Sequence, residues 1–226
     1  MAKEKGPNYD PSYAKYFDHT KLAPDATAQT ISDFCSQALE YGFAAVCVNP
    51  CRVKLAAGLL RGSGVHTATV VGFPLGANTT AIKAAETAEA VENGADEVDM
   101  VINIGALKDG NWDYVRQDIQ AVVDAAGSAA VKVIIETHAL TDPEKVRVCK
   151  LAEQCGAKFV KTCSGFYGSG GATVEDVALM RASVGPGVQV KASTGVHSRA
   201  DADRLIAAGA TRFGTSYGPK IVDGEV

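Results

Sequence analysis

Two patterns of hydrophobic residues alternate along the chain. Short runs rich in Val and Ile, such as residues 97–103 and 131–137, are apolar at most positions, which is typical of parallel strands buried on both faces. Between these runs, Ala-rich stretches repeat their apolar residues with the period of a helix. Parallel strands joined by crossover helices produce this alternation, so the pattern indicates an α/β fold.

The pattern predicts eight strands and six helices. The strands are expected at Tyr16–His19, Ala44–Val48, His66–Gly72, Glu97–Asn103, Val131–Thr137, Phe159–Cys163, Val188–Ala192 and Arg212–Thr215. The helices are expected at Thr27–Tyr41, Thr79–Asn93, Asp113–Ala126, Asp142–Cys155, Thr173–Ser183 and Arg199–Ala208. The hydroxyls of Thr173 and Ser198 stand where the first amides of a helix need acceptors, which supports two of these starts.

A Gly-Ala pair recurs before three of the later strands, at 94–95, 156–157 and 209–210. Glycine accepts the left-handed conformation that ends many helices, so each pair predicts a helix stop followed by a short loop and a strand. Eight such units without a Gly-rich dinucleotide-binding motif favour a (β/α)8 TIM barrel over an open doubly wound sheet. We therefore expect a single TIM-barrel domain over residues 1–226, with a flexible N-terminal segment at 1–11.

Composition and charge exclude several classes of function. The net charge is −4 and no basic run is present, whereas binding to a phosphate backbone needs concentrated Lys and Arg. The start of the chain is charged rather than apolar, and no apolar run reaches the roughly 18 to 20 residues of a membrane span. The sequence therefore predicts a cytoplasmic protein that binds neither nucleic acid nor a membrane.

The cysteines and histidines do not show the spacing of a metal site. Six cysteines lie at positions 35, 47, 51, 149, 155 and 163, and four histidines at 19, 66, 138 and 197. None of them forms the close Cys pair of a zinc site or the His pair that places two ligands on one helical face. We expect reduced thiols and no bound metal.

Three ionisable residues stand out within predicted strands that are mostly apolar. They are Asp99, Lys161 and Lys191, on the fourth, sixth and seventh strands. In a TIM barrel the carboxyl ends of the strands meet at one face, where active sites lie, so the three side chains should converge there. The alternatives are a lysine whose amine reaches solvent and an aspartate that accepts hydrogen bonds from loop amides. Lys132 comes at the beginning of its strand and is expected at the opposite, stabilising face.

Two lysines and a carboxylate suit the chemistry of a Schiff base. A lysine that attacks a carbonyl must be neutral, yet its free pKa is roughly 10.4, so the site has to lower it by burial or with a neighbouring cation. A second lysine supplies that cation, and Asp99 can hold it charged and share in proton transfer. The residues themselves do not decide which of the two lysines reacts.

The turns after the last two strands, residues 192–196 and 213–218, are small and rich in backbone amides. Loops at these places commonly bind phosphate in TIM barrels. The Gly-rich stretch 165–172 is predicted either to close over a substrate or to be a plain flexible loop.

The chain resembles the deoxyribose-phosphate aldolase family over nearly its whole length, from residue 18 to residue 218. The resemblance is carried by Asp18-His19-Thr20-Lys21-Leu22, Cys47-Val48-Asn49-Pro50, Val71-Gly72-Phe73-Pro74-Leu75-Gly76, Glu97-Val98-Asp99-Met100-Val101, Lys132-Val133-Ile134-Ile135-Glu136-Thr137, Phe159-Val160-Lys161-Thr162 and Val190-Lys191-Ala192-Ser193. The family cleaves 2-deoxy-D-ribose 5-phosphate reversibly to acetaldehyde and D-glyceraldehyde 3-phosphate. The resemblance implies the same reaction here, with no metal or organic cofactor, and we expect a homodimer.

The resemblance also implies a role for each ionisable residue. Lys161 forms the Schiff base, Lys191 lowers the pKa of Lys161 and joins the proton relay, and Asp99 is the acid/base partner of Lys191. The expected substrate-binding residues are Asp18, Thr20, Cys47, Gly165, Gly195, Gly214 and Ser216. For Cys47 we expect a thiol that faces the substrate and reacts with unsaturated aldehydes, the alternative being an inert core thiol.

Three positions near the expected phosphate site depart from the family pattern. Thr194 stands where the family usually has Gly, His197 where it has Arg, and Tyr217 where it has Ser. Two other functions therefore stay open. One is an aldolase of the same chemistry with another substrate, such as a transaldolase-like or 2-keto-sugar enzyme, and the other is a catalytically silent barrel that binds phosphate.

Overall fold

Eight parallel strands close into a barrel in a computed structural model of the chain, which describes residues 5–6, 8–168 and 170–226. The strands are β1 (Phe17–Lys21), β2 (Ala45–Val48), β3 (His66–Val71), β4 (Glu97–Val101), β5 (Ala130–Ile134), β6 (Phe159–Lys161), β7 (Gln189–Ser193) and β8 (Arg212–Thr215). They follow one another around the barrel in chain order, and β8 pairs with β1 through Phe213 and Phe17. All eight predicted strands are present, and the TIM-barrel fold is confirmed.

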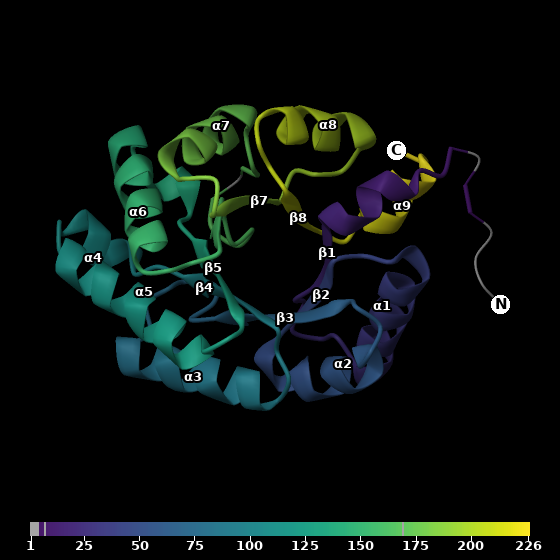
Figure 1. The fold of residues 1–226 in the computed structure, drawn as a ribbon, viewed down its shortest axis with the longest axis horizontal. Coiled ribbons are helices and arrows are strands. Elements are labelled where there is room, and N and C mark those ends of the chain that lie inside the picture. The colour runs from purple at the N-terminus through teal and green to yellow at the C-terminus, as the bar shows by residue number, and fades with distance from the viewer. Residues whose placement is uncertain (1–4, 7, 169) are drawn as a thin grey trace.

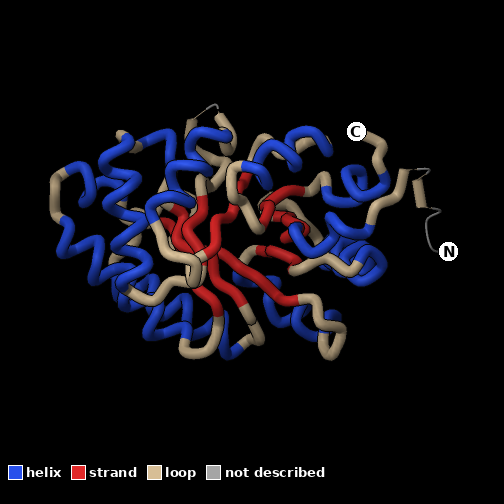
Figure 2. The backbone as a smooth tube through the Cα atoms, turned by 45° about the horizontal axis from the view of Figure 1, so that its top comes forward, coloured by secondary structure: helices blue, strands red, loops and turns tan. Residues whose placement is uncertain are grey.

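Helices surround the strands, as Figures 1 and 2 show. They are α1 (Ala28–Tyr41), α2 (Val53–Leu60), α3 (Thr80–Glu92), α4 (Ile104–Lys108), α5 (Trp112–Ala126), α6 (Asp142–Gln154), α7 (Val174–Ser183), α8 (Arg199–Ala207) and α9 (Gly218–Asp223), with 3-10 turns η1 (Pro11–Tyr16), η2 (Pro50–Arg52) and η3 (Thr137–Ala139). The six predicted helices are present, with ends that differ by one residue at most. The short helices α2, α4 and α9 were not predicted.

The local signals in the sequence act as expected at the helix ends. Gly94, Gly156 and Gly209 have φ angles of 102°, 90° and 107°, so each ends a helix in a conformation that glycine tolerates. At helix starts, the hydroxyl of Thr173 accepts a hydrogen bond from the Asp176 amide at 3.0 Å, and that of Ser198 accepts one from the Asp201 amide at 3.1 Å.

The barrel interior has an apolar side and a charged side. Ala45 and Cys47 on β2 form a small buried cluster with Ala68 and Val70 on β3. These short side chains leave room for long ones from the facing strands, and small barrels commonly fill their interior in this way. The large hydrophobic core lies outside the barrel wall, between the strands and the helices.

The two ends of the described chain lie against each other. The Asp10 amide donates a hydrogen bond to the Val222 carbonyl of α9 at 2.8 Å, and the guanidinium of Arg199 reaches the carbonyl of Asn8 at 2.9 Å. Residues 1–4 and 7 of the segment predicted to be flexible lie outside the described residues. None of the described helices has the length and apolar character needed to cross a membrane.

A buried ion pair joins two outer helices. The amine of Lys83 on α3 lies 2.5 Å from a carboxylate oxygen of Asp118 on α5, and it also donates to the Val101 carbonyl at 2.8 Å. Both side chains are fully buried, and burial lowers the pKa of Lys83. The pair fixes α3 and α5 against the end of β4.

We predict that Asp118→Ala lowers the free energy of unfolding by about 3–5 kcal/mol, because it leaves the Lys83 ammonium buried without its anion. Urea denaturation measures the change. The double variant Lys83→Met, Asp118→Leu is the control and should recover most of the loss, since it removes both charges. A loss below about 1 kcal/mol in Asp118→Ala, as for a surface pair, would contradict the prediction.

Candidate active site

A cavity of about 470 Å³ opens at the carboxyl ends of the strands, the face on which TIM-barrel active sites lie. Its walls come from the turns after β1, β6, β7 and β8. The lining residues are Thr20, Leu22, Ala23, Pro24, Lys161, Ser164, Gly165, Phe166, Ser193, Thr194, Gly195, His197, Gly214, Thr215, Ser216 and Tyr217. A larger hollow of about 600 Å³ at the other end of the barrel is lined by none of the predicted site residues.

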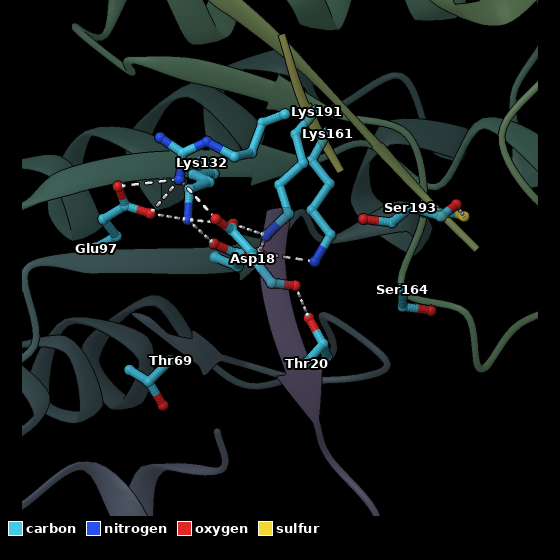
Figure 3. A network of polar contacts seen from close by, with 12 residues as sticks. Asp18, Thr20, Thr69, Glu97, Lys132, Lys161, Ser164, Lys191 and Ser193 are labelled. Carbon is cyan, nitrogen blue, oxygen red and sulfur yellow. Dashed lines mark hydrogen bonds and ion pairs between the residues drawn. The ribbon is translucent and has the colours of Figure 1, made fainter. Parts of the chain in front are cut away.

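Seven charged side chains fill the barrel beneath this cavity (Figure 3). The basic ones are Lys132, Lys161, Lys191 and Arg212, and the acidic ones are Asp18, Glu97 and Asp99. Six of them are buried, and the side chain of Arg212 is 13% exposed. Such a cluster is stable only if its charges are paired and hydrogen-bonded. We call this group the charge cluster.

Asp99 is the centre of the charge cluster. One carboxylate oxygen accepts a hydrogen bond from Lys132 at 2.8 Å, and the other accepts from Lys161 and Lys191, each at 2.7 Å. Burial alone would raise the pKa of Asp99, but the three lysines outweigh it and hold the pKa well below its ordinary value. Asp99 is therefore an ionised acceptor shared by three amines.

Lys191 lies between two carboxylates. Its amine donates to Asp18 as well as to Asp99, and Asp18 also accepts from Arg212 at 2.5 Å. Burial opposes the charge on Lys191, yet these two carboxylates outweigh it and hold the pKa of Lys191 above its ordinary value. The pKa of Asp18 is lowered in return, by the neighbouring cations. Lys191 is thus held as an ammonium ion.

Lys161 differs from the other two lysines of the charge cluster in both contacts and position. It contacts one carboxylate, that of Asp99, and among these three lysines it alone lines the cavity. The amines of Lys132 and Lys191 are fully enclosed beneath it. A carbonyl compound in the cavity meets the Lys161 amine first. The geometry therefore favours Lys161 as the reacting lysine, a choice that the residues of the sequence left open.

The charge cluster has four basic groups for three carboxylates. Arg212 stays protonated in proteins, and Lys191 is held charged by two carboxylates. Glu97 also pairs with the ring of His66 at 2.9 Å. Of the four basic groups, Lys161 is the one with a single carboxylate contact, that of Asp99.

The expected position of Lys132 is wrong. Its amine lies in the charge cluster, 2.8 Å from Asp99, 3.1 Å from Asp18 and 2.5 Å from Glu97. The pKa of Lys132 is well above its ordinary value, because these carboxylates outweigh the effect of burial. Lys132 is the central residue of β5 and the register partner of Asp99 on β4, so both side chains point into the barrel at the same level.

The structure brings most of the predicted substrate-binding residues to the cavity. Thr20, Gly165, Gly195, Gly214 and Ser216 line it, whereas Asp18 lies beneath it in the charge cluster. Their contacts with a substrate stay predictions.

Cys47 does not line the cavity. It is fully buried in the apolar cluster of β2 and β3, and burial raises the pKa of its thiol to about 11. A thiol that is enclosed and protonated is a poor nucleophile. These observations favour the alternative of an inert core thiol.

Several residues of the site were not predicted. Glu97 and Arg212 belong to the charge cluster, and each is a charged residue within a predicted strand, the same signal that pointed to Lys161. Ser193 and Phe166 line the cavity, and Phe166 packs against Phe73 with ring centroids 5.2 Å apart. Nothing in the local sequence distinguishes this serine at the end of β7, or this loop phenylalanine, from others that do not line a cavity.

The turns after β6 and β7 are held together at the rim of the cavity. Thr194 has a φ angle of 64°, unusual for a residue with a Cβ, and its carbonyl accepts a hydrogen bond from the Ala172 amide at 2.9 Å. A Cβ atom on Gly165 would lie 2.5 Å from the Thr194 hydroxyl, so glycine is required there for the two turns to approach.

Histidine, cysteine, aspartate and glutamate form no group of three or more that could hold a metal ion in the described part of the chain. The carboxylates of the charge cluster are bound by lysine and arginine.

A closed (β/α)8 barrel with a lysine amine in its mouth defines a class of enzymes, those able to bind a carbonyl compound as a Schiff base. The family model described as DeoC/LacD family aldolase matches residues 12–223. A deoxyribose-phosphate aldolase of Streptococcus gordonii is 60% identical over 93% of this chain and 96% of its own. A deoxyribose-phosphate aldolase of Macrococcus caseolyticus is 59% identical over 94% of this chain and 96% of its own.

Solved structures agree with these relatives. An aldolase designated QR15 has a TM-score of 0.88 at 38% identity, over 93% of this chain and 94% of its own. The deoxyribose phosphate aldolase of Aeropyrum pernix, described as tetrameric, has a TM-score of 0.87 at 31% identity, over 94% of this chain and 90% of its own. The chain therefore belongs to the DeoC/LacD family of aldolases, and the expectation of an aldolase is confirmed.

We predict that Lys132→Met lowers the free energy of unfolding at pH 7 by about 3–5 kcal/mol, because three buried carboxylates lose a shared cation. The carboxyl pKa values of the parent are held low, so their stabilising effect is present at neutral pH and is lost as the pH falls below about 4. The difference between parent and variant should therefore shrink in acid. Urea unfolding of the parent and the variant, at pH 7 and in acid, measures the loss at neutral pH and its decrease in acid. Lys158→Met, an exposed lysine next to β6, is the control, and an equal effect of both variants would contradict the prediction.

Proposed function

We propose that this chain is a class I aldolase that reversibly cleaves 2-deoxy-D-ribose 5-phosphate to acetaldehyde and D-glyceraldehyde 3-phosphate. The observation that carries the proposal is the Lys161 amine, which lies in the cavity with Asp99 and the Lys191 ammonium directly beneath it. The family membership supports the reaction type, and the names of the relatives support the substrate.

The substrate lies with its aldehyde carbon at Lys161 and its phosphate toward the turns after β7 and β8. Backbone at Gly195 and Gly214 and the hydroxyl of Ser216 line that end of the cavity, where TIM barrels commonly bind phosphate. His197 and Tyr217 also line it, with ring centroids 4.9 Å apart. They replace the arginine and the small hydroxyl that the family usually has there.

The reaction begins when the neutral Lys161 amine adds to the aldehyde carbon C1 of the open sugar. The Lys191 ammonium, with Asp99 as its acceptor, supplies a proton so that the oxygen leaves as water and an iminium ion forms. The acid/base pair of Lys191 and Asp99 then takes the proton of the C3 hydroxyl, and the bond between C2 and C3 breaks. The iminium takes up the bond electrons as an enamine, and D-glyceraldehyde 3-phosphate is released.

The second half returns Lys161 to its free form. Carbon C2 of the enamine takes a proton from the same acid/base pair, and water hydrolyses the resulting iminium to acetaldehyde and the amine. Lys191, hydrogen-bonded to Asp99, exchanges these protons with the substrate, so the acid/base pair is in place before the substrate binds.

The apolar side of the barrel favours acetaldehyde over a ketose as the donor. Leu22 lines the cavity and packs against the small cluster of β2 and β3, which contains Ala45 and Cys47. This surface suits the methyl group of acetaldehyde but offers no hydrogen bond to the hydroxymethyl group of a ketose. A transaldolase-like or 2-keto-sugar reaction is therefore the less favoured alternative.

The cytoplasmic location, the homodimer and the independence from any metal or organic cofactor stay predictions. The tetramer described for the Aeropyrum pernix enzyme is a property of that protein.

We predict that Lys161→Ala abolishes cleavage and that borohydride traps a two-carbon adduct of acetaldehyde on Lys161 in the parent protein, because its amine is the one that meets the carbonyl. Peptide mass spectrometry locates the adduct. Lys158→Ala, at an exposed lysine three positions earlier, is the matched control and should trap like the parent. An adduct on Lys191 in the parent would reverse the assignment.

We predict that Lys191→Leu slows turnover by about 100-fold or more, a range typical of the loss of a general acid. It should also move the pH dependence of Schiff-base trapping to higher pH, because the cation that favours a neutral neighbour is gone. Trapping is measured against pH in the parent and in the variant. If the two pH profiles coincide, Lys191 has no part in controlling the protonation of Lys161.

A further inference from the structure

Among the described residues that line the cavity, one buried hydroxyl has no hydrogen-bond partner, that of Ser193. The residue is 4% exposed, and buried hydroxyls are nearly always hydrogen-bonded. In Figure 3 the Ser193 side chain is directed toward the lysines of the charge cluster. A buried, unpaired hydroxyl at the edge of a cavity is prepared to bind a group that enters the cavity.

The neighbouring hydroxyls of the cavity already have partners. Thr20 donates to the Asp18 carbonyl at 2.8 Å, and Thr215 donates to the Val196 carbonyl at 3.0 Å. Ser164 accepts a hydrogen bond from the Phe166 amide at 3.1 Å. Ser193 is thus set apart from them by its free hydroxyl.

The backbone of Ser193 is fixed although its hydroxyl is free. Its amide donates to the Thr162 hydroxyl at 3.1 Å, and its carbonyl accepts from the Cys163 thiol at 3.0 Å. Gly214 on β8 is its partner in the strand register, and a Cβ atom on Gly214 would overlap the Ser193 hydroxyl. Glycine at 214 therefore keeps the space around this hydroxyl open.

The position of Ser193 determines which part of a substrate it meets. It follows Lys191 by two residues on β7, so both side chains point to the interior and Ser193 lies nearer the mouth. The turn that begins with Thr194 and Gly195 comes directly after it. Ser193 thus lies between the charge cluster and the turns proposed to bind phosphate.

Between the carbon bound to Lys161 and the phosphate, the sugar carries hydroxyls on C3 and C4. The C3 hydroxyl loses its proton during cleavage and must face the acid/base pair of Lys191 and Asp99. The C4 hydroxyl takes no part in bond breaking, so it is available for recognition. In the released aldehyde it is the hydroxyl on the carbon next to the carbonyl.

We infer that the Ser193 hydroxyl binds the C4 hydroxyl of the sugar and sets the preference of the enzyme for acceptor aldehydes with a hydroxyl next to the carbonyl. This inference rests on the proposed function. A site that hydrogen-bonds a substrate hydroxyl discriminates against the analogue that lacks it, because its own polar group is then left unpaired.

The test is the aldol addition of acetaldehyde to two acceptors with the same phosphate. One is D-glyceraldehyde 3-phosphate, and the other is 3-oxopropyl phosphate, which lacks the hydroxyl next to the carbonyl. We expect Ser193→Ala to lower kcat/KM for the first acceptor by about 10-fold and to leave kcat/KM for the second unchanged. The preference of the parent for the first acceptor should fall by the same factor.

Two variants and one measurement separate recognition from a general defect. Ser183→Ala removes a buried hydroxyl on α7, which donates to the Leu179 carbonyl at 2.6 Å far from the cavity, and should keep the preference of the parent. Ser164→Ala removes the hydroxyl of the cavity serine that follows β6 and should also keep the preference. Borohydride trapping of acetaldehyde on Ser193→Ala should equal that of the parent.

An equal loss with both acceptors in Ser193→Ala, or a selective loss in Ser164→Ala instead, overturns the inference and leaves the proposed function intact. A parent protein that traps acetaldehyde on no lysine and adds it to neither acceptor overturns the proposed function, and this inference with it.

Discussion

The shared carboxylate of Asp99 is the interaction on which the site depends. It holds amines from three successive strands, Lys132 of β5, Lys161 of β6 and Lys191 of β7, within hydrogen-bond distance of two oxygen atoms. A buried carboxylate with this many cations cannot be removed without leaving charge unpaired in the interior. The carboxylate of Asp99 therefore both neutralises buried charge and positions the Lys161 amine, which is proposed to react.

The charge cluster is possible because the barrel interior is asymmetric. Short side chains on β2 and β3, among them Ala45 and Ala68, leave volume that long lysines from the facing strands occupy. Glu97 and Arg212 lie on the side of the charge cluster away from the cavity and complete its pairing. Each of the three carboxylates is paired with at least two basic groups.

The groups proposed for catalysis and those proposed for substrate recognition lie at different levels along the barrel axis. The groups proposed to transfer protons lie below, where their charges are buried, and the rim above includes glycines, hydroxyls and three aromatic rings. The rim is held by contacts between turns, such as that of Thr194 with Gly165, rather than by charge. Ser193 belongs to β7 and stands at the boundary between these two levels.

The sequence by itself determined the barrel and most of its reacting groups, because apolar periodicity, Gly-Ala helix stops and a charge within an apolar strand are local signals. Helices α2, α4 and α9 were not predicted, because five to eight residues are too few to show a helical period. Only the tertiary structure placed Lys132 with Asp99 and showed that Lys161, not Lys191, lines the cavity, which supports the assignment that the resemblance implied. Barrel closure brings Lys191 to Asp18 across 173 positions, and which amines share a buried carboxylate depends on such long-range contacts, not on spacing along the chain.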